Sequence, residues 1–342
     1  MIIIRSLKQR IALLPLFAVF LSLLSACSDK PLESFKLSGM TMGTSYHITI
    51  IGNPAEAAQL TQKIDFRLAL INQQMSTYIA SSELCKFNQL PPGEWQTVSP
   101  ELFDVLLTSS EIAWLTNGSF DITVAPLVDL WGFGPEHVES IPSNDAINAQ
   151  LLNVGFQHLE FNLQGSKITK SKPIRLDLSA IAKGYGVDLI AKLLRDEGYN
   201  NFMVEVGGEL YLSGLSPRKT AWRIAIEQPS SQNPGIHRAI KVSGKAVATS
   251  GDYRNYIERN GVRYSHTIDP RTGRPITHSL VSVTVIHEDV ASADALATAI
   301  SVMGIEAGMA LAEQQNLAIY LISKTKQGFE SQYSDAFKPY LD

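Results

Sequence analysis

The chain has 342 residues, and 45% of them are hydrophobic, which is enough apolar side chain for a large buried core. It carries 29 basic and 33 acidic residues and has no clusters of lysine and arginine, so nucleic acid is excluded as the expected partner. No internal repeat or low-complexity tract interrupts the chain, and we expect one folded body with room for two lobes.

The N-terminus has the pattern of a cleaved export signal. Three basic residues precede an apolar run at residues 11–24 that is too short to span a membrane comfortably. The small residues before Cys27 resemble the lipobox of bacterial lipoproteins, which implies cleavage after Ala26 and a lipid on Cys27. The alternative is an ordinary signal peptide with an incidental cysteine. We therefore expect a signal peptide at 1–26, a lipid-anchored tether at 27–36 and a folded domain at 37–342.

The rest of the chain alternates strand-like and helical segments. Apolar residues recur at helical spacing from Ala55 to Met75, and Pro100 opens a second helix that runs through Trp114. Between Phe120 and Pro142 the aromatic, Gly- and Pro-rich sequence predicts an ordered loop. Further strands are predicted at Tyr46–Ile51, Phe202–Val206, Trp222–Ile226, Ser282–Ile286 and Ala318–Ile322, and further helices at Ala180–Glu197, Ala291–Met303 and Ile305–Gln315. This alternation predicts an α/β to α+β fold with mixed sheets packed against helices, and it leaves the strand order open.

Several segments in the first half of the chain have the composition of ligand-binding loops. In Thr41-Met42-Gly43-Thr44 the glycine lets backbone approach a ligand closely, although a plain turn is the simpler interpretation. Ser119-Phe120-Asp121 leads to Trp131-Gly132-Phe133-Gly134, where backbone amides alternate with aromatic rings that suit a planar ligand or plug a core. Tyr78 is either another stacking ring or an ordinary half-buried tyrosine.

Asp177 and Lys183 flank the expected start of a helix. The free N–H groups and the dipole of a helix N-terminus favour a nearby phosphate. Asp177 does not suit phosphate itself, so it is expected to accept hydrogen bonds from a sugar, a base or a ring N–H. Lys183 lies one turn further along and could reach the same ligand. The alternative is that this segment serves helix capping through Ser179.

Two segments in the last third carry candidate chemistry. His266 is expected on a short strand ahead of an Asp-Pro turn, and histidine has an ordinary pKa near neutrality that suits a general base, although a lone histidine is usually structural. Asp294 and Thr298 are four residues apart, so both oxygens project from one helix face. These hard oxygen ligands suit Mg²⁺ better than zinc. The alternative is an ordinary helical charge with a threonine bonded to its own helix.

Together these segments resemble the ApbE family of FAD:protein FMN transferases. The resemblance runs in order from about Phe35 to Lys338 and includes the lipobox. Its motifs are Thr-Met-Gly-Thr, Phe-Asp-Ile-Thr-Val-Ala-Pro-Leu-Val, Leu-Trp-Gly-Phe-Gly-Pro, Asp-Leu-Ser-x-Ile-Ala-Lys-Gly, Val-Glu-Val-Gly-Gly-Glu, Thr-Ser-Gly-Asp-Tyr-Arg-Asn-Tyr, Ser-His-Thr-Ile-Asp-Pro-Arg-Thr-Gly and Ala-Asp-Ala-Leu-Ala-Thr. It implies an ApbE-like fold with an FAD and metal site in a cleft.

The resemblance also implies roles for individual residues. FAD is expected to contact Met42, Tyr78, Ser119, Phe120, Asp121, Asp177, Lys183 and Ile268. The metal is expected between Asp294, Thr298 and the main-chain carbonyl of Ala180. Some relatives have Thr at the position of Ala180 and an acidic residue at that of Ala297, so Ala180 is limited to main-chain ligation and a role for Ala297 is in doubt. Relatives also vary between Glu and Lys at Lys183, which makes its contact less secure than that of Asp177.

The implied reaction transfers FMN from FAD to a threonine hydroxyl of an acceptor protein and releases AMP, with His266 as the base and Mg²⁺ at the phosphates. The family's usual acceptors are subunits of Na⁺-translocating quinone reductases and related electron-transport complexes. A metal-dependent FAD pyrophosphatase and a non-catalytic flavin-binding lipoprotein remain as alternatives. The expected location is the periplasmic side of a bacterial envelope. Ser28 after the lipidated cysteine favours the outer membrane, whereas the expected acceptors favour the inner membrane.

Overall fold

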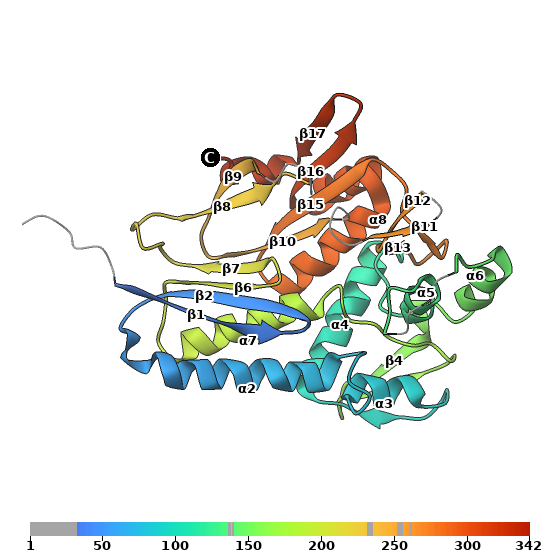
Figure 1. Ribbon diagram of the computed structural model, residues 1–342. Helices are drawn as coiled ribbons and strands as arrows, with labels where there is room; N and C mark the ends of the chain where they lie inside the picture. Colours follow the sequence, from blue (N-terminus) through green and yellow to red (C-terminus); the bar gives the residue numbers. More distant parts are fainter. Residues whose placement is uncertain (1–32, 136–137, 139, 231–234, 252–255, 260–261) are drawn as a thin grey trace, which may run out of the picture.

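A computed structural model describes residues 33–135, 138, 140–230, 235–251, 256–259 and 262–342 (Figure 1). The expected signal peptide and Cys27 lie outside these residues. The first strand, β1 (Ser34–Thr41), starts within the segment expected as a tether at 27–36. It pairs along its whole length with β2 (Thr44–Ile51), so residues 34–36 belong to the folded body.

An eight-stranded sheet is the centre of the fold. Its order is β1-β2-β6-β7-β10-β15-β16-β17, and each neighbouring pair is antiparallel. The remaining strands of this sheet are β6 (Phe202–Val206), β7 (Glu209–Ser213), β10 (Lys245–Gly251), β15 (Leu280–His287), β16 (Ala318–Thr325) and β17 (Gly328–Tyr333). The α/β to α+β class expected from the sequence is therefore confirmed. Mixed sheets were expected, but all neighbouring strands of the eight-stranded sheet pair antiparallel.

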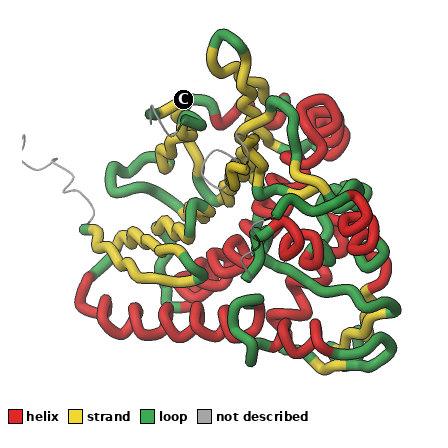
Figure 2. Tube along the Cα trace, turned by 45° about the vertical axis from the view of Figure 1, so that its right-hand side comes forward, coloured by secondary structure: helices red, strands yellow, loops and turns green. Residues whose placement is uncertain are grey.

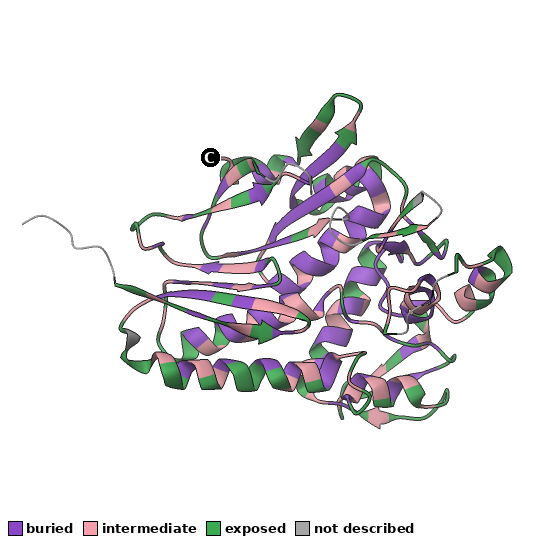
Figure 3. Ribbon diagram, viewed as in Figure 1, coloured by how far each residue is buried: buried purple, intermediate pink, exposed green. Residues whose placement is uncertain are grey.

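Helices cover one face of the sheet and enclose the main core. The helix α7 (Ala182–Asp196) lies against β6 and β7, and α8 (Val290–Gln315) lies against β10 and β15. Two further helices, α2 (Ala57–Met75) and α4 (Pro100–Leu115), pack on the outer side of α7 and α8. Figure 2 shows this separation of helices from the run of strands, and Figure 3 shows α8 buried where α2 keeps an exposed outer face.

The helix α8 consists of two helical segments, as the sequence predicts. Gly304 has φ +78° and ψ −177°, which no α-helix contains, and it separates the segments expected at Ala291–Met303 and Ile305–Gln315. Within the described part of the chain, α8 is the one helix long and apolar enough to cross a membrane. It packs against the sheet on one side and against α7 and α4 on others, which makes it a core helix of the folded domain.

A smaller core covers the other face of the sheet. The hairpin of β8 (Trp222–Glu227) and β9 (Ile236–Val242) packs there together with a 3-10 helix, η3 (Asp335–Tyr340). Trp222 and Phe337 are among its buried side chains.

A 3-10 helix, η1 (Pro54–Glu56), leads into α2. The remaining elements form a lobe beside α4. They are the 3-10 helix η2 (Phe156–His158), the helices α3 (Glu83–Gln89), α5 (Ala125–Trp131) and α6 (Asn144–Leu151), and the strands β3 (Gln96–Thr97), β4 (Leu159–Asn162), β5 (Lys167–Lys170), β11 (Tyr256–Arg259), β12 (Val262–Ser265), β13 (Ile268–Asp269) and β14 (Arg274–Pro275). The helix α5 corrects the expectation of a loop throughout Phe120–Pro142. Pro126 suits its first turn, Gly132 ends it at φ +81°, and the indole of Trp131 donates to the carbonyl of Gly273 at 2.8 Å.

Candidate functional site

A cavity of about 1500 Å³ opens where these layers meet. Its walls come from the β1–β2 turn, the loop before α5, the start of α7, the β6–β7 turn, the end of β10, the β12–β13 segment and α8. The residues expected at the FAD and metal sites all line it: Met42, Tyr78, Ser119, Phe120, Asp121, Asp177, Ala180, Lys183, His266, Ile268, Asp294 and Thr298. The structure thus brings together every expected site residue except Cys27, which lies outside the described residues.

Met42 and Gly43 form the two-residue turn between β1 and β2. Their φ values are +48° and +71°, and Thr41 pairs with Thr44 across the turn. Both positive φ values are typical of a type I′ hairpin turn, and such a value is uncommon for methionine. The Met42 side chain reaches α7, where its terminal methyl lies 3.0 Å from the position that a Cβ would take on Gly186. The segment is therefore a turn, as the simpler interpretation holds, and it forms one end of the cavity wall.

The loop Ser119–Asp121 lines the cavity, and Phe120 and Asp121 are only 2% and 6% exposed. The Asp121 carboxylate accepts hydrogen bonds from the N–H and hydroxyl of Thr123 at 2.8 and 2.7 Å and from the N–H of Phe156 at 2.8 Å. Burial raises the pKa of Asp121, and these hydrogen bonds oppose that shift. The Ser119 hydroxyl is buried and has no hydrogen-bond partner among the described residues, so it remains available to a ligand.

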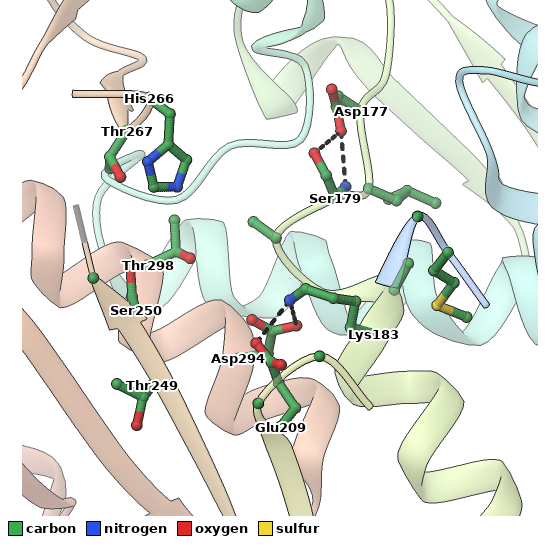
Figure 4. A pocket seen from close by; sticks show the side chains of 18 of the residues that line it. Asp177, Ser179, Lys183, Glu209, Thr249, Ser250, His266, Thr267, Asp294 and Thr298 are labelled. Carbon is green, nitrogen blue, oxygen red and sulfur yellow. Dashed lines mark hydrogen bonds and ion pairs between the residues drawn. The ribbon is translucent and has the colours of Figure 1, made fainter. Parts of the chain in front are cut away.

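Asp177 organises the entry to α7. One of its carboxylate oxygens accepts hydrogen bonds from the N–H of Ser179 at 2.7 Å and from the Ser179 hydroxyl (Figure 4). Burial raises the pKa of Asp177, while the Ser179 bonds lower it. The residue before α7, Ile181, makes no side-chain cap, and the helix begins at Ala182 rather than at Ala180. The capping role considered for Ser179 is therefore wrong. In the first turn, the N–H of Ala182 donates to the carbonyl of Leu178 and that of Gly184 to the Asp294 carboxylate.

Tyr78 lines the cavity from a more exposed position. Its side chain is among the exposed large apolar groups, at 71%. Burial of part of the ring, and then the negative charges of Asp177 and Asp129, raise the pKa of Tyr78. The Tyr78 hydroxyl is therefore protonated at neutral pH, and the exposed, uncharged ring can stack on a planar ligand at the cavity mouth.

The half-buried Lys183 and the buried Asp294 and Glu209 form a charged cluster on the cavity floor (Figure 4). The Lys183 ammonium lies 2.7 Å from Oε1 of Glu209 and 3.5 Å from Oδ2 of Asp294. Burial by itself would lower the pKa of Lys183, but the charges of Asp294 and Glu209 outweigh it and raise that pKa. The lysine is therefore held in its charged form by two carboxylates.

A close approach of α7 and α8 places this cluster. A Cβ on Gly184 would lie 2.4 Å from the carbonyl oxygen of Val290, so a larger residue would push the helices apart. The N–H of Gly184 donates to Oδ2 of Asp294 at 3.2 Å. Thr298 follows Asp294 by one turn of α8, and both line the cavity as their spacing predicts.

His266 lies in the bend between β12 and β13, one residue beyond the strand on which the sequence analysis placed it. Its ring meets the edge of Phe133 at 6.5 Å between centroids and 72° between planes. Phe133 belongs to the Trp-Gly-Phe-Gly segment, so that loop supports the histidine. Figure 4 shows the imidazole pointing into the cavity on the side of Thr298.

Several polar residues of the cavity wall have no role that the sequence predicts. Glu209 follows the Gly207-Gly208 turn, and both glycines have positive φ, at +59° and +105°. The hydroxyls of Thr249 on β10 and Thr284 on β15 lie 2.9 Å apart. The available signals were the Val-Gly-Gly-Glu and Thr-Ser-Gly-Asp motifs, but neither shows which side of a strand faces a ligand.

The chemistry of the floor fits a hard divalent cation. The described residues contain no group of three or more His, Cys, Asp and Glu side chains that could hold a metal ion, so a cation here would also need hydroxyl or main-chain oxygens. The floor offers the carboxylates of Asp294 and Glu209, the Thr298 hydroxyl and the main chain of Ala180. Oε2 of Glu209 is buried without a hydrogen-bond partner in the described part of the chain. Oxygen donors of this kind suit Mg²⁺.

Comparisons with known proteins agree with this arrangement. The ApbE family model matches residues 42–321. A protein of Vibrio cholerae named FAD:protein FMN transferase is 46% identical over 325 residues, which is 94% of this chain and 96% of that protein. Its namesake from Escherichia coli K12 is 38% identical over 344 residues and 97% of each chain.

Solved structures give the same result. The flavin transferase ApbE from Vibrio cholerae superposes with a TM-score of 0.85 at 45% identity, covering 91% of this chain and all of that one. The apo flavinyl transferase ApbE of Pseudomonas stutzeri has a TM-score of 0.83 at 37% identity, over 90% of this chain and 97% of that one. With sequence, fold and family model in agreement over nearly the whole folded domain, the chain belongs to the ApbE family.

Proposed function

We propose that this protein is an FAD:protein FMN transferase, which moves FMN from FAD to a threonine hydroxyl of an acceptor protein and releases AMP. The observation that carries the proposal is the single cavity that contains the flavin-binding candidates, a histidine and a buried pair of carboxylates. A carrier of flavin needs neither a base nor a cation site. Two relatives, 46% and 38% identical to this chain, bear the name of this activity.

FAD binds as substrate across the cavity. Tyr78 stacks on a ring system at the mouth, and the loop Ser119–Asp121 offers backbone groups together with the unpartnered Ser119 hydroxyl. Asp177 accepts hydrogen bonds from the sugar or a ring N–H. The first residues of α7 line the cavity, so the positive end of the helix dipole favours the pyrophosphate there.

Asp294, Thr298 and the main-chain carbonyl of Ala180 are the residues that would hold Mg²⁺. A cation bound there neutralises charge on the pyrophosphate. Lys183 supplies a second positive charge on the same floor. Phosphoryl transfer depends mainly on such positioning and neutralisation.

His266 acts as the general base. It takes the proton from the acceptor threonine, whose oxygen attacks the phosphorus on the FMN side of FAD. The bond from that phosphorus to the bridging oxygen breaks, AMP leaves with the electron pair, and FMN remains attached to the acceptor through a phosphoester. General-base catalysis of this type typically contributes about 10²–10⁴-fold to the rate.

The acceptor is a flavoprotein, and we propose subunits of membrane electron-transport complexes of the Na⁺-translocating quinone reductase type. A lipid on Cys27 would hold the enzyme on the periplasmic side of the cell envelope, beside such complexes. Residues 27–33 then connect the lipid to β1, which begins at Ser34.

Mass spectrometry of a candidate acceptor tests the transferase proposal. The acceptor is incubated with the protein, FAD and Mg²⁺, and a mass increase of one FMN residue is expected. An acceptor in which the target threonine is replaced by alanine is the matched control and should stay unmodified. Release of AMP without modification of any acceptor would assign the protein as an FAD pyrophosphatase, and FAD binding without AMP release would leave a flavin carrier.

A further inference from the structure

The cluster on the cavity floor has a feature that its expected roles do not explain. Lys183 is a candidate FAD contact and Asp294 a candidate metal ligand, yet their side chains contact each other, with the ammonium 3.5 Å from Oδ2 of Asp294. The ammonium is closer still to Glu209, at 2.7 Å. One positive charge is therefore shared between two carboxylates.

Glu209 provides an independent sign that the cluster binds a cation. It is 4% exposed, and Oε1 faces Lys183 while Oε2 is buried without a hydrogen-bond partner among the described residues. A buried carboxylate oxygen left unpaired costs free energy unless a ligand satisfies it. Both carboxylates belong to residues that line the cavity.

We propose that Glu209 and Asp294 form one cation-binding pair, for which the Lys183 ammonium acts as an internal cation that competes with the divalent metal. This inference rests on the metal site proposed above and adds Glu209 to it. An ammonium and a divalent cation at the same two carboxylates repel each other, so each weakens the binding of the other. A metal that binds the pair therefore displaces Lys183, and the released ammonium faces the cavity, where the FAD phosphates bind. Metal binding and FAD binding are thereby coupled through one side chain.

Titration of the FAD-free, full-length protein with Mn²⁺, followed by the electron paramagnetic resonance signal of free Mn²⁺, measures the competition. Lys183→Met removes the internal cation and should tighten Mn²⁺ binding about tenfold or more. The double variant Lys183→Met/Glu209→Gln should bind Mn²⁺ more weakly than Lys183→Met, by a similar factor. Lys192→Met is the matched control, because Lys192 pairs with Asp196 at 2.6 Å on the exposed side of the same helix, and its affinity should equal that of the wild type.

The unaltered protein gives a second measurement that needs no variant. Lysine acetylation read by mass spectrometry should show Lys183 becoming more reactive when Mg²⁺ is added, with Lys192 unchanged. The inference is overturned if Lys183→Met binds Mn²⁺ no more tightly than the wild type, or if Mg²⁺ leaves the reactivity of Lys183 unchanged or lower.

Asp294→Asn separates this inference from the metal site itself. Loss of Mn²⁺ binding in Asp294→Asn with unchanged affinity in Lys183→Met would retain the metal site and reject the competition. Wild-type affinity in Asp294→Asn would reject the metal site as proposed.

Discussion

The carboxylate of Asp188 on α7 accepts a 2.9 Å hydrogen bond from the N–H of Val290, the first residue of α8. It also accepts from the N–H of Ala291 at 2.9 Å. A carboxylate at a helix N-terminus satisfies otherwise unpaired N–H groups and interacts favourably with the helix dipole. Because α7 carries Lys183 and α8 carries Asp294, this contact fixes the two helices that form the cavity floor.

Asp188→Asn should change how stability depends on pH. Burial raises the pKa of Asp188 from 3.8 to about 7, so the folded protein binds more protons than the unfolded chain between these values. The resulting contribution to the free energy of unfolding is present at low pH and is lost as the pH rises to about 7. Between pH 5 and pH 8 the wild type should therefore lose about 1 kcal/mol or more relative to the variant.

Urea unfolding curves at a series of pH values measure this difference. Asp196→Asn is the control, since Asp196 is exposed at the far end of the same helix, and it should follow the wild type in parallel. If the free energy of unfolding changes with pH in the same way for Asp188→Asn and the wild type, Asp188 does not titrate in this range.

Asp177→Ala should weaken FAD binding by about tenfold or more, because the second carboxylate oxygen has no hydrogen bond with the described part of the chain and the side chain lines the cavity. A flavin fluorescence titration measures the affinity, with Asp196→Ala as an exposed control. Affinity equal to that of the wild type would remove Asp177 from the flavin contacts.

Asp294→Ala should lower turnover and metal dependence far more than it lowers stability. The carboxylate is buried and accepts one hydrogen bond from Gly184, so its removal costs a buried contact as well as the proposed ligand. Transfer rates across a Mg²⁺ series, with thermal unfolding in parallel, separate the two effects. Normal activity at limiting Mg²⁺ would contradict the proposed metal site.

Cys27→Ser should leave the transferase active but release it from membranes. The lipid supplies the membrane affinity, whereas the described cavity involves no residue before Met42. Fractionation of cells expressing each form, followed by an activity assay of both fractions, checks this. A variant that stays fully membrane-bound would contradict the lipobox interpretation.

The sequence predicts the helices of this fold better than its sheet. Apolar residues at helical spacing placed α2 within two residues of its observed start, and the break at Gly304 separated the halves of α8. The sheet depends on pairing between distant segments, such as β2 with β6 and β10 with β15, which no local pattern specifies. The same limit applies to β1, whose apolar pattern is too weak to distinguish it from a tether.

The sequence predicts more residues of the candidate site than strand pairings of the sheet, because the site residues belong to short motifs. The structure brings these residues into one cavity. What the motifs did not show is how the residues contact one another. Glu209 was given no role, although it is the nearest carboxylate to Lys183. Ser179 was considered as a helix cap but bonds Asp177 instead. Such contacts follow from how segments far apart in the chain pack.

His266→Ala tests the chemistry separately from binding. If the imidazole is the base, the variant should bind FAD and Mg²⁺ with nearly unchanged affinity while its transfer rate falls by about 10²–10⁴-fold. The imidazole packs against the ring of Phe133 and lies apart from the charged cluster on the cavity floor. Its removal should therefore leave the contacts among Lys183, Glu209 and Asp294 in place. Single-turnover transfer to an acceptor, measured beside FAD titrations, gives both quantities. His158→Ala serves as the control, because His158 bonds Ser171 outside the cavity. Loss of FAD affinity in His266→Ala would make the residue a flavin contact and place the base elsewhere, and transfer at the wild-type rate would exclude His266 from the proton transfer.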